Sequence, residues 1–276
     1  MSHHLYSKGR YAMNRTSSLP AAAVCVIGAA GAVLRLAHTR TCYEESGLIL
    51  PGRPLTALLT AALIAVILIG VIIGAMLAIR SRRTPPDDRP DAAPRGPLPA
   101  ACCAVSALLT AAGTIWQFAS SSPRTTLLII CSALGLAAAA AAAVMAARPS
   151  RLRSVRWPCA AVGTFFCLEL VRHFAANTLN PVALSFGPEC LALGAVSLFA
   201  FCLGTARGQA RGFGTVCFGL CAAGLCLTAL TGPQITWPDR LILLTGTLFS
   251  LAFVFRLPVA GDTRPSPRER ETEKTK

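Results

Sequence analysis

Eight long apolar segments run through this chain, and they restrict its fold more than any other feature. Each contains few charges and is about the length that a helix needs to cross ~30 Å of hydrocarbon at 1.5 Å per residue. Because a backbone in lipid must satisfy its own hydrogen bonds, each segment is expected to form a helix. We expect transmembrane spans at residues 20–36, 54–79, 98–119, 126–147, 157–176, 182–204, 212–230 and 241–255.

The composition is that of a membrane protein rather than a soluble domain. Of the 276 residues, 54% are hydrophobic and only 14% are charged, whereas soluble domains carry about 25% charged residues. The predicted fold class is therefore all-α, an integral membrane helical bundle with eight transmembrane helices. We divide the chain into a cytoplasmic tail at 1–18, the transmembrane domain at 19–257 and a disordered cytoplasmic tail at 258–276.

The distribution of Lys and Arg predicts the orientation. Segments expected on one side of the membrane hold 20 of the 26 Lys and Arg residues. Such a bias over short loops marks the cytoplasmic side, so both ends of the chain are expected in the cytoplasm. The other side would hold Arg35, Arg40, Arg53, Arg124 and Arg240, which leaves Arg172 as the one intramembrane cation. Three tryptophans fall at span ends, as in an aromatic belt: Trp116, Trp157 and Trp237.

The net charge of +14 would suggest nucleic acid if it formed one basic face on a soluble fold. Here the cations stand beside apolar segments, so the expected partner is a lipid bilayer with anionic headgroups, and nucleic acid is not expected. The strong preference for Arg over Lys and the abundant Ala indicate a GC-rich bacterial coding sequence. We therefore expect a multi-pass protein of the bacterial plasma (inner) membrane. A membrane-protein partner or a homo-oligomer remains open.

The first span admits two interpretations. Lys8, Arg10 and Arg15 precede it, as cations precede the apolar part of a signal peptide, and Ala30-Gly31-Ala32 resembles a cleavage site. The apolar run continues beyond that site, which favours an uncleaved span. Met13 is an alternative start of the protein.

The 12 cysteines do not predict a disulfide framework or a metal site. Eleven lie in or beside apolar segments, where Cys acts as a small hydrophobe. Only Cys42 is expected in an outer loop, and no C-x-x-C pair occurs. Cys217 and Cys221 share a helix face, but they lack a nearby His or acid, so packing is favoured over metal binding. We expect no metal and no other cofactor.

Catalytic motifs are absent from the sequence. It contains no G-x-S-x-G, H-E-x-x-H or Walker loop. The Glu44-Glu45 pair invites comparison with membrane-embedded CAAX-type proteases, whose motif is E-E-x-x-x-R, but position 49 is Ile. No pairing of a nucleophile with a base can be written, so no catalytic residue is assigned and an enzyme is not expected.

The fifth span carries the residues best suited to a binding site. Glu169, His173 and Asn177 recur every four residues and therefore share one stripe of a helix. Arg172 lies three residues after Glu169, on the adjoining face. Ionisable residues inside a membrane are costly and mark functional sites. These four residues are therefore candidate ligand-binding residues.

Glu189 in the sixth span completes the candidate set. The fifth span runs outward and the sixth inward, so Glu169 and Glu189 are expected at one depth, about 10 Å below the outer surface. Pro188 is expected to break a helix and free a carbonyl near Leu184. The alternative to a ligand site is a structural salt bridge, in which Arg172 neutralises either acid while His173 and Asn177 reach toward the headgroups.

The first outer loop, residues 41–52, allows two interpretations. Its acids Glu44 and Glu45 and its Tyr43 would cap the outer mouth of the cavity, or Gly47 and Pro51-Gly52 simply form turns before a helix.

Two functions fit these patterns. The first is the binding or transport of a small molecule or ion at an outward-facing polar site. The second is a non-catalytic structural or regulatory membrane subunit that acts through helix contacts. Gly70 and Gly74 form a G-x-x-x-G step that permits close helix contact, but this motif does not distinguish the two.

Several short motifs resemble multi-pass membrane proteins of Clostridia-like bacteria that have no known function. The motifs are the stretch from Tyr43 to Leu48 with Pro51-Gly52, the segment from Phe165-Phe166 to Arg172, Asn180-Pro181, and Glu189 to Ala192. The resemblance implies a multi-pass membrane architecture and carries no activity.

Overall fold

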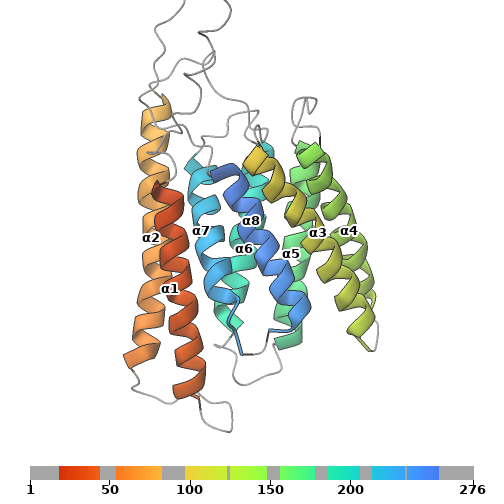
Figure 1. The fold of residues 1–276 in the computed structure, drawn as a ribbon, viewed down its shortest axis with the longest axis horizontal. Helices are drawn as coiled ribbons and strands as arrows, with labels where there is room; N and C mark the ends of the chain where they lie inside the picture. Colours follow the sequence, from red (N-terminus) through yellow and green to blue (C-terminus); the bar gives the residue numbers. More distant parts are fainter. Residues whose placement is uncertain are drawn as a thin grey trace, which may run out of the picture.

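The computed structural model describes residues 19–43, 54–82, 97–122, 125–147, 156–177, 186–205, 213–233 and 235–254. Its regular elements are eight helices, which lie side by side in one bundle (Figure 1). They are α1 (Leu19–Thr41), α2 (Pro54–Arg82), α3 (Pro97–Ser120), α4 (Thr126–Ala147), α5 (Arg156–Asn177), α6 (Gly187–Thr205), α7 (Phe213–Ala229) and α8 (Trp237–Val254).

The bundle has the character of a membrane protein. Seven of the eight described helices are long and apolar enough to cross a bilayer, and α7, with 17 residues, is shorter. Large apolar side chains are exposed on the outside, among them Val33, Leu108, Phe201 and Trp157. Apolar surface on this scale is expected where lipid rather than water covers the protein. The prediction of an all-α bundle is confirmed for the described residues, and seven of its helices are long and apolar enough to cross a membrane.

Two helix boundaries differ from the predicted spans in a way that matters for function. Helix α1 continues to Thr41, beyond the predicted end at Leu36, so His38 also lies on the helix. Helix α8 begins at Trp237 rather than at residue 241 and therefore includes Asp239. The predicted boundaries were wrong here because apolarity marks the part of a helix that crosses lipid and not its polar end turns.

A capping interaction explains the early start of α8. The Thr236 amide donates to Asp239 Oδ2 at 3.3 Å, and the Asp239 amide points back to Thr236 Oγ1 at 3.5 Å. This reciprocal arrangement satisfies amide groups that the first turn of a helix leaves unpaired.

Pro188 does not break the described part of α6. Helix α6 begins at Gly187, so Pro188 is its second residue. Proline is tolerated in a first turn because the amide that it lacks would have no partner within the helix there. Leu184, whose carbonyl was expected to be freed, lies outside the described residues.

Six helices form a closed ring, and two more pack against it. Each helix from α3 to α8 packs on the next, and α3 packs on α8 to close the ring. Helices α1 and α2 pair with each other and both pack on α7 (Figure 1). Helix α7 therefore joins the pair to the ring, since it contacts α1, α2, α6 and α8.

Small residues allow these close contacts around α7. A Cβ atom added to Gly70 would lie 2.6 Å from Cys221 Sγ, and one added to Gly74 would lie 3.0 Å from Cys217 Cβ. The G-x-x-x-G step of α2 thus packs within the chain, against the two α7 cysteines that were assigned to packing. Both cysteines are buried and free.

Replacing Gly224 of α7 tests this packing. In Gly224→Ala the new Cβ would lie 2.7 Å from Val66 Cγ1 and 3.0 Å from Val24 Cγ1. Valine has a stiff χ1 and cannot easily move aside, and overpacking typically costs about 1–3 kcal/mol. We expect a lower melting temperature of the purified protein in detergent, measured by a thermal unfolding assay.

Gly194→Ala is the matched control, because the nearest side-chain atom would be 3.9 Å away in mid-helix α6. It should leave the melting temperature unchanged or raise it, since Ala favours a helix more than Gly does. Equal melting temperatures for the two variants would contradict the packing described for α7.

Candidate functional site

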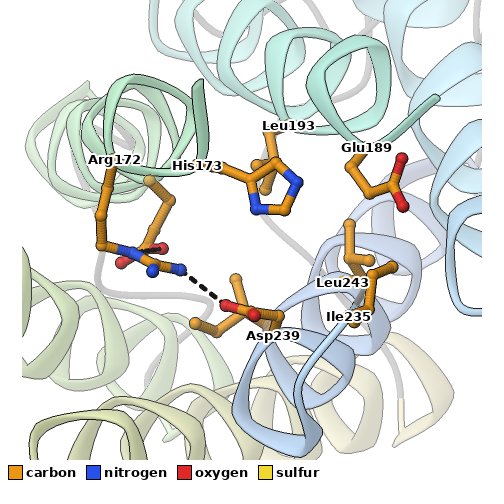
Figure 2. A pocket seen from close by; sticks show the side chains of 9 residues that line it. Arg172, His173, Glu189, Leu193, Ile235, Asp239 and Leu243 are labelled. Atoms are coloured by element: carbon orange, nitrogen blue, oxygen red, sulfur yellow. Dashed lines mark hydrogen bonds and ion pairs between the residues drawn. The ribbon is translucent and has the colours of Figure 1, made fainter. Parts of the chain in front are cut away.

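Five ionisable side chains meet at the end of the ring where α5 ends and α6 and α8 begin. Glu169, Arg172 and His173 come from the last turns of α5, and Glu189 and Asp239 come from the first turns of α6 and α8. They line one small cavity together with the apolar side chains of Leu193, Ile235, Ile242 and Leu243 (Figure 2).

Arg172 bridges two carboxylates. Its Nε donates to Glu169 Oε2 at 2.8 Å, and its Nη2 donates to Asp239 Oδ1 at 2.6 Å. The first contact is the one that the i, i+3 spacing on α5 predicts. The second joins α5 to α8 across the ring. Gln117 of α3 adds a longer hydrogen bond from Nε2 to Asp239 Oδ1, at 3.3 Å.

The carboxylate of Glu189 pairs with Arg35 rather than with Arg172. Glu189 Oε1 accepts from Arg35 Nη2 at 2.5 Å, and both side chains are almost fully buried. Arg35 also donates to the carbonyl of Ala229 at 3.5 Å. Arg35 was expected among the outer cations, but its side chain is buried in the bundle, so Arg172 is not the one arginine that reaches inside it. Arg35 stands near the end of the predicted span 20–36, on the face of α1 that packs on α7.

His173 lies between these two groups. Figure 2 shows its imidazole ring projecting into the space between Arg172 and Glu189. The ring packs edge-on against Phe186, with centroids 6.2 Å apart. Its Nε2 is buried and has no hydrogen-bond partner in the structure. The interpretation in which His173 reaches out to the headgroups is wrong, because the residue is only 7% exposed.

Asn177 does not join the site. Its Nδ2 donates to the backbone carbonyl of His173 at 2.7 Å, one turn earlier on α5. It is not among the residues that line the cavity. The structure therefore brings together four of the five predicted residues, and Asn177 instead bonds to its own helix.

The cavity is small and incompletely satisfied. Its volume of about 10 Å³ for the centre of a water molecule is about what a single water needs. Four buried polar atoms around it have no hydrogen-bond partner: Gln117 Oε1, Glu169 Oε1, His173 Nε2 and Glu189 Oε2. Such atoms are costly to bury, so each calls for a water, an ion or a functional reason.

Three contributors were missed in the sequence: Arg35, Gln117 and Asp239. Arg35 had a signal in the sequence, since Gly28, Gly31 and Arg35 follow one another at helical spacing. In the structure all three are buried on the face of α1 that packs on α7. Asp239 also had one, because Thr236 stands three residues before it, as in a capping box. Gln117 had no such signal, since its role depends on the packing of α3 against α8.

The first outer loop is described only at its start. Tyr43 packs edge-on against His38, with centroids 5.4 Å apart, and His38 Nε2 is 3.0 Å from Thr56 Oγ1. These contacts join the ends of α1 and α2. Glu44 and Glu45, the acids expected to cap the cavity, lie outside the described residues.

A larger hollow lies at the opposite end of α5 and α6. It has a volume of about 310 Å³ and is lined by Arg156, Trp157, Ala160, Ala200, Phe201, Gly204 and Thr205. Its lining contains a single ionisable side chain. Size alone therefore does not mark the candidate site, and Arg156 provides a control for substitutions of buried arginines.

Removing one charge of the Arg35–Glu189 pair should cost more stability than removing both. Arg35→Met leaves the Glu189 carboxylate buried without its cation, and breaking a buried pair typically costs about 3–5 kcal/mol. The double variant Arg35→Met/Glu189→Leu removes both charges and should recover most of the loss in melting temperature. Arg156→Met, at the other end of the bundle, should lower the melting temperature less, because Arg156 is exposed. Equal melting temperatures for Arg35→Met and Arg156→Met would contradict the buried pairing of Arg35.

Comparison of the chain with models of known protein families finds none that matches, and comparisons with curated proteins and with solved structures find no match either.

Proposed function

We propose that this chain is a multi-pass protein of a bacterial plasma membrane that binds or transports a small molecule or ion at the polar cavity between α5, α6 and α8. In this proposal all eight helices cross the bilayer, both termini lie in the cytoplasm, and the cavity lies near the outer surface. No catalytic role is proposed, because the cavity residues offer no nucleophile paired with a base.

The observation that carries the proposal is the set of unpaired buried atoms around the cavity. Glu169 Oε1 and Glu189 Oε2 come from different helices, and each belongs to a carboxylate whose other oxygen is already bound to an arginine. A structural ion pair needs only to neutralise the acids. Acceptor atoms without a partner, on two side chains that line one cavity, are what a bound ligand would use.

The size of the cavity limits the ligand. With room for about one water, it suits an ion or a very small molecule. A larger solute would require α5, α6 and α8 to move apart, and the contact of Arg172 on α5 with Asp239 on α8 would resist that movement. The proposal therefore favours an ion over an organic molecule.

The second candidate function is a structural or regulatory subunit without a ligand. The two charge clusters favour it, since they join α1 to α6 and α5 to α8 and would fix these helices in register. Helices α1 and α2 also expose many large apolar side chains, which a partner helix or a second copy of the chain would cover. Response to a solute separates the two functions.

Reporter fusions test the proposed orientation. A fluorescent protein fused after Lys276 should be fluorescent, because both tails carry the cations expected on the cytoplasmic side. Alkaline phosphatase, which is active only outside the cytoplasm, should be active when fused after Asn180 and inactive when fused after Pro90. The reverse pattern of phosphatase activity would refute this orientation.

Thermal-shift screening tests the ligand. The purified protein is heated in the presence of monovalent and divalent salts, small organic acids and small amines at fixed pH. A ligand present at 100 times its Kd stabilises the folded state by about 2.7 kcal/mol, so the correct solute should raise the melting temperature by a measurable amount.

Glu189→Gln should remove this response, whereas Asp87→Asn, in the hydrophilic stretch between α2 and α3, should keep it. A solute that stabilises wild type and Glu189→Gln equally does not bind at the cavity. If no solute stabilises the protein, the subunit function is favoured.

A further inference from the structure

The charges around the cavity do not balance. Among the described residues, three carboxylates meet there, those of Glu169, Glu189 and Asp239, but only two guanidinium groups, those of Arg35 and Arg172. The pair of Arg35 and Glu189 is neutral. The group of Glu169, Arg172 and Asp239 carries one surplus negative charge while His173 is neutral.

No other described cation is placed to cancel this charge. Arg240 is next to Asp239 in the chain, but its guanidinium lies over the Trp237 ring, 4.8 Å from the ring centre. His38 on α1 contacts Thr56 and Tyr43 instead. The other titratable groups close to the clusters are a phenol and two thiols, which are ordinarily uncharged near pH 7: Tyr43 after α1, Cys131 on α4 and Cys190 on α6.

An uncompensated charge is costly where side chains are mostly buried. In the group with the surplus charge, Glu169 is 1% exposed and the Asp239 side chain is 14% exposed, and burying a charge costs several kcal/mol even after the protein relaxes around it. One positive charge would remove the imbalance. A hydrated metal cation is larger than a cavity that admits about one water, whereas a proton requires no additional volume.

His173 is placed to carry that proton. Its ring lies between the two clusters (Figure 2), and its unpaired Nε2 is buried. A proton bound there forms an imidazolium. The total charge of the three carboxylates, the two guanidinium groups and His173 is then zero. The unpaired oxygens Glu169 Oε1 and Glu189 Oε2 are alternative positions for the same proton.

We propose that the cavity is a site for one exchangeable proton, which is shared among His173 and the surrounding carboxylates. The proton comes from water on the outer side. Binding makes one N–H or O–H bond, and release returns the proton to water and restores the single negative charge. This inference rests on the proposed function, since it names the ion that the cavity binds.

The experiment is a pH titration of purified protein from about pH 4 to pH 9, a range that covers carboxylic acids and imidazole. Isotope-edited infrared spectroscopy reports protonated carboxyl groups, and ¹⁵N NMR of labelled histidine reports the imidazole. A background with His3, His4 and His38 replaced by Gln leaves His173 as the one histidine in the sequence and so identifies its signal. We expect one proton to titrate at the cavity, seen as a single transition.

Variants that remove a negative or a positive charge from the cavity should shift the midpoint of the titration in opposite directions. Asp239→Asn removes the surplus negative charge and retains an oxygen for the cap of α8, so the affinity for the proton should fall by about tenfold or more. Arg35→Gln adds a second surplus negative charge, so the affinity should rise by a similar factor. Asp87→Asn should leave the titration midpoint unchanged. If Asp239→Asn does not fold, Glu169→Gln is used in its place, because it also removes one negative charge from the group of Glu169, Arg172 and Asp239.

Three results would overturn the inference. The first is a wild-type protein in which neither His173 nor a buried carboxyl titrates. The second is a midpoint that is the same in Asp239→Asn and Asp87→Asn. The third is a transition that disappears when Na⁺ or K⁺ replaces choline in the buffer, which would assign the positive charge to a metal cation. In each case a solute that stabilises wild type but not Glu189→Gln would leave the proposed function standing.

Discussion

Charges buried at one end of this bundle must find their partners inside the protein, because lipid does not solvate them. Arg172 meets this requirement by bridging α5 and α8, and Arg35 meets it by reaching from α1 to the first turn of α6. Each contact joins helices that are distant in sequence. The ion pairs therefore define the cavity and also hold in place the helices that enclose it.

The remainder of the fold brings these charges close enough to pair. Arg35 reaches Glu189 only because α1 lies close to α7, and that approach depends on Gly28 and Gly31, where any larger residue would overlap α7. Helix α7 is almost entirely buried and contacts four other helices. Small residues far from the cavity are thus needed for its geometry. A substitution that separates α1 from α7 would also separate the charges.

The sequence predicts those parts of the fold that depend on local pattern. Apolar length identifies the spans, and the predicted bounds of α4 agree with the structure. The i, i+3 spacing predicts the contact of Glu169 with Arg172, and antiparallel neighbours predict that Glu189 lies near them. The sequence allowed Arg172 to pair with either Glu169 or Glu189. In the structure Arg172 pairs with Glu169, and Glu189 pairs with Arg35.

What could not be predicted depends on contacts between distant segments. Arg35 and Asp239 stand near polar ends of helices, which apolarity does not mark, so Arg35 was expected with the outer cations and Asp239 was not predicted to join the site. Gln117 joins the site because α3 closes the ring against α8. Pro188 shows a further limit, since the same residue breaks a helix or begins one depending on where the helix starts.

The central claim is that arginines of α1 and α5 are paired with carboxylates inside the bundle when the protein is in a bilayer. Solid-state NMR tests it directly, using protein in lipid with ¹⁵N in the arginine guanidinium groups and ¹³C in the glutamate carboxyls. The structure predicts two strong dipolar couplings, from Arg35 to Glu189 and from Arg172 to Glu169, and the first alone should vanish in Arg35→Met. Absence of both couplings in the wild-type protein would contradict the account.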